Sequence, residues 1–178
     1  MDDLIFTLDP GSLRTGFACL TMEGQLREAG LLLPDKREAA SEFRIGAMCG
    51  DLRELLEKWG PAVVVIEWTS GKVNTSRHKG AGAGLAVHGA ATGALWRECE
   101  AWRRSLPAAM QGRTMIELVR ENQWARGTPK AARQAAVAQE FPQYNPADDP
   151  GMDISDALAL DRWWLRERAV RMLEGAAV

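Results

Sequence analysis

Near the start of the chain, two short apolar segments flank a Pro-Gly pair, and an aspartate ends the first of them. Residues 4–9 (LIFTLD) and 15–21 (TGFACLT) are predicted strands, and Pro10-Gly11 is a strong turn signal because proline presets φ and glycine accepts a positive φ. Asp9 is therefore expected at the end of a central strand, where a carboxylate is costly unless something pairs with it. Two partners remain open at this point: a divalent metal ion, or the amides of the turn that follows.

The length and composition indicate a folded globular protein. With 178 residues, of which 46% are hydrophobic, the chain can bury a full core, and we expect one domain over 1–178. No apolar run approaches the roughly 20 residues of a membrane span, and the acidic start Met1-Asp2-Asp3 lacks a signal-peptide pattern. The three cysteines, Cys19, Cys49 and Cys99, are far apart and odd in number, which argues against a disulfide framework and makes a reducing cytoplasm the expected compartment.

The charged residues are unevenly distributed along the chain. The formal net charge is −2, yet residues 70–135 hold eleven Lys and Arg against four Asp and Glu, whereas the remainder holds eleven against twenty. A basic middle within an acidic chain indicates one positively charged face, of the kind that binds nucleic acid. A set of solvated helix faces is the alternative interpretation.

The first sixty residues predict a three-stranded meander followed by a helix. Residues 4–9, 15–21 and 25–33 alternate with short turns, which favours antiparallel pairing. Residues 36–59 contain apolar side chains at the spacing of one buried helix face, and Gly60-Pro61 ends that pattern.

A second carboxylate ends the next predicted strand. Residues 62–67 (AVVVIE) form a β-branched run typical of a strand buried on both faces. A right-handed crossover through the preceding helix would place this strand parallel to the first. Glu67 and Asp9 would then lie at the same edge of the sheet, where α/β proteins place their sites.

The second half of the chain predicts mainly helices. Thr128 and Pro129 suit the N-cap and first position of one of them. The expected elements are a basic loop over 70–79, a helix over 81–104, a fifth strand within 104–110, a helix over 128–141, a loop over 142–151 and a last helix over 153–173. The whole pattern predicts an α/β fold with a mixed five-stranded sheet and helices on both faces.

Two further carboxylates stand at the start of the last predicted helix. Asp153 and Asp156 are three residues apart, so they share one helix face. Stabilisation by the helix dipole would explain acidic residues there without any ligand. A cluster that also held Asp9 and Glu67 would, however, be unfavourable without cations, and hard metal ions with oxygen ligands suit it. Two such ions can activate water for phosphodiester hydrolysis.

These motifs, in this order, resemble the RuvC family of Holliday-junction resolvases within the RNase H-like nucleases. The first strand and turn, the strand ending at Glu67 and the sequence DISDALA from Asp153 to Ala159 match the family's three acidic motifs. The helix over 81–101 resembles the family's glycine- and alanine-rich helix, and residues 127–130 (GTPK) resemble its approach to the penultimate helix. The resemblance spans nearly the whole chain and implies an RNase H-like fold.

The resemblance also implies an activity, a cofactor and a partner. The expected protein is a homodimer that cuts four-way DNA junctions symmetrically with Mg²⁺ or Mn²⁺, two ions per active site. The implied metal ligands and catalytic residues are Asp9, Glu67, Asp153 and Asp156, and Lys130 carries over as a contact to DNA or within the catalytic site. A symmetric junction needs two sites, and the helix with Gly89 and Gly93 is the candidate interface, unless that face packs on its own sheet.

The expected DNA contacts lie in the basic middle of the chain or directly before it. They are Trp68, Lys72, Arg77, Lys79, Lys130 and Arg133. The family often has an aromatic residue for base stacking a few positions after the glutamate. Here only Trp68, directly after Glu67, is aromatic. Packing at the end of the strand would explain a tryptophan at this position equally well.

Other residues and other functions fit the sequence pattern less well. Asp148 and Asp149 are expected to be solvated turn residues, and His88 is expected to pack within the small-residue helix. An actin-like ATPase shares the first phosphate turn, but a second domain and second phosphate loop are lacking. A catalytically inactive protein that binds branched DNA is the third possibility, which four intact acids disfavour.

Overall fold

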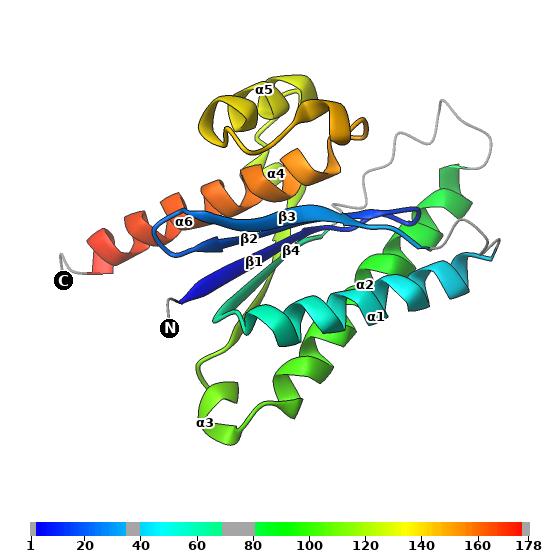
Figure 1. Cartoon of the computed structure of the whole chain (residues 1–178), viewed down its shortest axis with the longest axis horizontal. Coiled ribbons are helices and arrows are strands. Elements are labelled where there is room, and N and C mark those ends of the chain that lie inside the picture. Colours follow the sequence, from blue (N-terminus) through cyan, green and yellow to red (C-terminus); the bar gives the residue numbers. More distant parts are fainter. Residues whose placement is uncertain (1–2, 35–39, 69–80, 176–178) are drawn as a thin grey trace.

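The computed structural model describes residues 3–34, 40–68 and 81–175. These form one mixed sheet with helices on both sides (Figure 1). The sheet has the order β3-β2-β1-β4-β5, with β1 paired antiparallel to β2 and parallel to β4. The strands are β1 (Leu4–Asp9), β2 (Thr15–Thr21), β3 (Leu26–Leu32), β4 (Val63–Trp68) and β5 (Met115–Arg120).

The pairing of β1 with β4 places two of the acidic residues at one sheet edge. Leu8 lies opposite Ile66 in the parallel register, so Asp9 and Glu67 follow at the ends of adjacent strands. The predicted meander, the crossover and the parallel pairing are all confirmed.

Two helical layers cover the sheet. Helices α1 (Ser41–Trp59) and α2 (Ala81–Ser105) bury one face around Phe6, Leu52 and Trp102, whereas α6 (Asp153–Gly175) covers the other face (Figure 1). The shorter helices are α3 (Ala108–Gln111), α4 (Glu121–Trp124), α5 (Lys130–Glu140) and the 3₁₀ turn η1 (Pro146–Asp148). None of the described helices is both long and apolar enough to cross a membrane.

Two predicted boundaries are wrong, each for a local reason. The strand expected within 104–110 is absent, because α2 continues to Ser105 and Pro107 precedes the short helix α3; the fifth strand is 115–120 instead. Thr128 is not an N-cap, because α5 begins one residue later with Pro129 at the cap and Lys130 as its first residue. Of the helix expected over 36–59, residues 36–39 lie outside the described part, and α1 begins at Ser41.

One glycine allows the last helix to approach the sheet. Gly16 of β2 lies opposite Asp9 in the ladder, and a Cβ added there would overlap the backbone carbonyl of Asp153. The start of α6 therefore lies directly on β2, next to the end of β1. The hydroxyl of Thr7 in β1 adds a second connection, since it donates to the carbonyl of Ala157 at 2.9 Å.

We predict that Gly16→Ala displaces the start of α6 and lowers the free energy of unfolding by about 2 kcal/mol, the middle of the range for overpacked sites. The matched control is Gly50→Ala in α1, where an added Cβ meets no atom within 4 Å. That control should gain roughly 0.5–1 kcal/mol because alanine is the better helix former. Equal effects of the two substitutions on urea unfolding would contradict this account of the contact.

Candidate active site

The four predicted acidic residues line one cavity at the edge of the sheet. Asp9 and Glu67 reach it from the ends of β1 and β4, and Asp153 and Asp156 from the first turn of α6. The turn Pro10–Arg14 and Lys130 complete much of its wall. Segments that are far apart in the sequence therefore bring their carboxylates to the same place.

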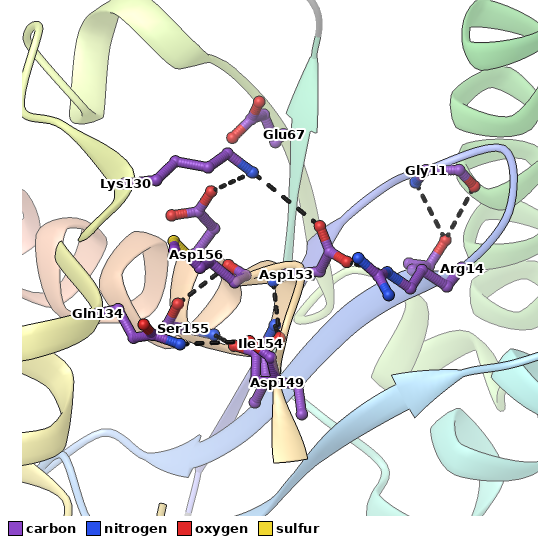
Figure 2. Close-up of polar contacts among 12 residues, drawn as sticks. Gly11, Arg14, Glu67, Lys130, Gln134, Asp149, Asp153, Ile154, Ser155 and Asp156 are labelled. Atoms are coloured by element: carbon purple, nitrogen blue, oxygen red, sulfur yellow. Dashed lines mark hydrogen bonds and ion pairs between the residues drawn. The ribbon is translucent and has the colours of Figure 1, made fainter. Parts of the chain in front are cut away.

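Asp149 holds the first turn of α6 in position. Its carboxylate accepts hydrogen bonds from the amides of Asp153 (2.9 Å), Ile154 (3.2 Å) and Ser155 (2.9 Å) (Figure 2). It also accepts one from the hydroxyl of Tyr144 at 2.8 Å. The expectation that Asp149 is solvated is wrong, because these donors bury it completely. A signal was present: an aspartate a few residues before a helix can accept bonds from the free amides of its first turn.

Three basic side chains pair with the two carboxylates of α6. Arg14, from the turn after β1, binds Asp153. Lys130 places its Nζ 2.8 Å from Oδ2 of Asp156 and 4.0 Å from Oδ1 of Asp153 (Figure 2). Arg133 binds Asp156 with two parallel bonds, from Nε to Oδ1 at 2.7 Å and from Nη2 to Oδ2 at 2.9 Å.

The two carboxylates on the strands have a different environment. Among the described residues, no basic side chain forms an ion pair with Asp9 or Glu67, although Glu67 accepts a hydrogen bond from Trp124 Nε1 at 3.0 Å. Burial, followed by the negative charge of Glu67, raises the pKa of Asp9 well above its ordinary value. Burial and the charges of Glu121 and Asp156 raise the pKa of Glu67 to about 7.

The chemistry of these groups suits a hard divalent cation. Carboxylate oxygens are the ligands that Mg²⁺ and Mn²⁺ prefer, and a cation would relieve the repulsion that raises the pKa of Asp9 and Glu67. In the described part of the chain, however, no three Asp, Glu, His or Cys side chains are yet arranged to hold an ion. The ammonium of Lys130 and the guanidinium of Arg14 now contact the carboxylate oxygens that an ion would use.

The remaining predicted site residues fall into different surroundings. Trp68 ends β4 and borders a groove along α2 with Trp96, Arg97 and Arg104. Lys130 is half exposed at the mouth of the carboxylate cavity. The predicted DNA contacts Lys72, Arg77 and Lys79 lie outside the described residues.

Two residues differ from their predicted roles. Arg133, expected to contact DNA, is only 8% exposed and its donors are directed at Asp156, so it is not free to bind a phosphate in this arrangement. His88 was expected to pack within α2, but it lines the carboxylate cavity. The sequence pattern of α2 could not reveal this, because the neighbours of His88 come from other elements.

The arrangement of strands and helices is that of the RNase H-like fold, as found in Holliday-junction resolvases. Thermus thermophilus RuvC in complex with a Holliday-junction substrate superposes with a TM-score of 0.63 at 18% identity, over 88% of each chain. Thermus thermophilus RuvC in a second structure gives 0.60 at 18% identity, over 88% of this chain and 89% of that one.

The yeast mitochondrial Holliday junction resolvase Ydc2 has a TM-score of 0.56 at 13% identity, over 98% of this chain and 84% of its own. No family model and no curated protein matches the sequence. The chain therefore has a RuvC-type fold, which confirms the fold expected from the sequence motifs.

The raised pKa of Glu67 predicts how stability depends on pH. Between its ordinary value of 4.5 and about 7, the folded protein holds a proton that the unfolded chain has released, so stability falls as pH rises through this range. Glu67→Gln, whose amide oxygen can still accept from Trp124, should stabilise the metal-free protein at pH 8 by about 3 kcal/mol at most. The gain should shrink toward pH 5.

Urea unfolding in EDTA at both pH values measures this effect. Glu57→Gln, at an exposed position of α1, is the matched control and should leave the pH dependence unchanged. A Glu67→Gln protein that is no more stable than the unsubstituted protein at pH 8 would contradict the prediction.

Proposed function

We propose that the protein is a metal-dependent, structure-specific endonuclease that cleaves four-way DNA junctions symmetrically by phosphodiester hydrolysis. The observation that supports this most directly is the convergence of Asp9, Glu67, Asp153 and Asp156 on one cavity. The likeness of the fold to RuvC bound to a Holliday junction agrees with it. Neither an actin-like ATPase nor an inactive DNA-binding protein is favoured, because the superposed structures named above are those of resolvases and all four carboxylates line one cavity.

Each residue has a role that follows from its position. Asp9, Glu67, Asp153 and Asp156 would hold two Mg²⁺ or Mn²⁺ ions, which when bound lower the pKa of water and stabilise the leaving oxygen. Lys130 is half exposed beside these carboxylates, so its ammonium can turn from Asp156 to a phosphate of the DNA. Lys72, Arg77 and Lys79 remain proposed phosphate contacts, and Trp68 a proposed stacking surface.

Cleavage of a synthetic four-way junction tests the activity. We expect cleavage with Mg²⁺ or Mn²⁺ and none in EDTA. Asp9→Asn, Glu67→Gln and Asp156→Asn should each lower the cleavage rate by more than about 100-fold. Loss of a residue that only hydrogen-bonds to a metal ligand already costs about 10–100-fold in activity or metal affinity. Junction binding in a gel-shift assay should be retained.

The control for these variants is Asp148→Asn, which alters an exposed aspartate whose carboxylate bonds to Asn145. It should cleave as the unsubstituted protein does. Near-normal cleavage by any of the three site variants would remove that residue from the proposed ligand set. A protein that cleaves no junction with either metal would refute the proposed activity.

Symmetric cleavage requires a second site, which we propose comes from a second copy of the chain. The small-residue face of α2 is open: a Cβ added at Gly84, Gly89 or Gly93 meets no described atom within 4 Å. Trp96 on the same helix is 39% exposed and borders the groove that also contains Trp68. Ala91 and Leu95, by contrast, are buried, and Leu95 belongs to the core that includes Phe6 and Ile66 of the sheet. Helix α2 therefore has an inner face for its own core, and we propose its outer face for a partner.

We predict that Gly89→Leu yields a folded monomer that no longer makes paired incisions. Gly50→Leu, at an equally open position of α1, is the matched control and should remain dimeric. Sedimentation velocity gives the oligomeric state, and a cruciform plasmid separates paired incision (linear product) from single incision (nicked circle). Linear product from a protein that stays monomeric at micromolar concentration would overturn the dimer proposal.

A further inference from the structure

Two carboxylates of the site are held by a tryptophan and an arginine that also contact each other. Trp124, at the end of α4, donates from Nε1 to Oε2 of Glu67 at 3.0 Å. Arg133, in α5, forms its two parallel bonds with Asp156. The guanidinium carbon of Arg133 lies 4.9 Å from the centroid of the Trp124 ring, so the two side chains form one stack.

The Trp124–Arg133 stack is buried, whereas Lys130, the second basic residue that binds Asp156, is half exposed. Arg133 and Trp124 are 8% and 7% exposed, and Nη1 of Arg133 also donates to the carbonyl of Thr128 at 2.5 Å. Lys130, on the same carboxylate, has a side chain that is 49% exposed. A cation arriving from solvent can therefore displace Lys130 without disturbing Arg133.

We infer that Trp124 and Arg133 are positioning residues that hold Glu67 and Asp156 in the orientation required for divalent-cation binding. The inference rests on the proposed metal-dependent function. Because the two parallel bonds of Arg133 occupy one lone pair on each Asp156 oxygen, an ion must use the remaining lone pairs, and Lys130 now contacts the one on Oδ2. Through the stack, the orientation of Asp156 on α6 is linked to that of Glu67 on β4.

A tryptophan–glutamate hydrogen bond with an arginine over the tryptophan ring also occurs away from the cavity. Trp164 Nε1 donates to Oε2 of Glu117 at 2.7 Å, and the guanidinium carbon of Arg168 lies 5.7 Å from the Trp164 ring centroid. None of these three residues lines the carboxylate cavity. Trp164→Phe therefore removes the same kind of hydrogen bond, from a residue equally buried, without touching the site.

The experiment compares Mn²⁺ binding to the full chain, without DNA, by electron paramagnetic resonance of the free ion. Trp124→Phe should weaken Mn²⁺ binding by about tenfold, as expected for the loss of an outer partner of a metal ligand. Trp164→Phe should bind as the unsubstituted protein does, even where the two variants lose similar thermal stability. Arg133→Lys, which keeps the positive charge but cannot form two parallel bonds to Asp156, should weaken Mn²⁺ binding to a similar extent.

A second measurement separates positioning from general destabilisation. Raising the Mn²⁺ concentration should restore junction cleavage by Trp124→Phe, which an unfolded fraction would not allow. If Trp124→Phe and Arg133→Lys bind Mn²⁺ as tightly as the unsubstituted protein does, the inference is overturned. Junction cleavage by the unsubstituted protein would still support the proposed function in that case. Weakened Mn²⁺ binding in both variants, with no junction cleavage by the unsubstituted protein, would instead refute the function alone. An unsubstituted protein that binds no Mn²⁺ would overturn both.

Discussion

Repulsion among the carboxylates that line one cavity is the constraint that the rest of the site satisfies. The structure meets it in two ways. The two carboxylates of α6 are neutralised by Arg14, Lys130 and Arg133. The two on the strands, Asp9 and Glu67, have raised pKa values instead, so protons can take the place of missing counter-charges. Internal cations and protons thus offset the charge of these carboxylates.

The geometry of the cavity also depends on two residues that do not line it. Gly16 leaves room for the backbone of α6 on β2, and Asp149 fixes the amides of the first turn of that helix. These two contacts determine where the first turn of α6 lies and in which direction Asp153 and Asp156 point. The strands supply a rigid frame and the helix is docked onto it, which is how a pair of carboxylates on a helix can face a pair on a sheet.

The order of the sheet and the meeting of the four acidic side chains at one cavity follow from local signals in the sequence. Strand-end acids after apolar runs and the three-residue spacing of Asp153 and Asp156 are patterns within single elements. The burial of Arg133 and Asp149 and the exposure of His88 to the cavity were missed, because each depends on which elements meet in space. The prediction of the fifth strand is wrong because β5 is an outermost strand of the sheet. Its exposed and half-buried side chains weaken the apolar pattern that identifies a strand.

The hydrogen bond between Thr7 and the carbonyl of Ala157 spans 150 positions of the chain. During synthesis the strands and the helices α1 and α2 leave the ribosome first, and at that stage the sheet edge carries only Asp9 and Glu67. The two remaining carboxylates, together with Arg133 and Asp149, come from the last third of the chain. A nascent chain therefore has the frame of the site but not the cavity that the four carboxylates line, and completion of the fold and of the site coincide.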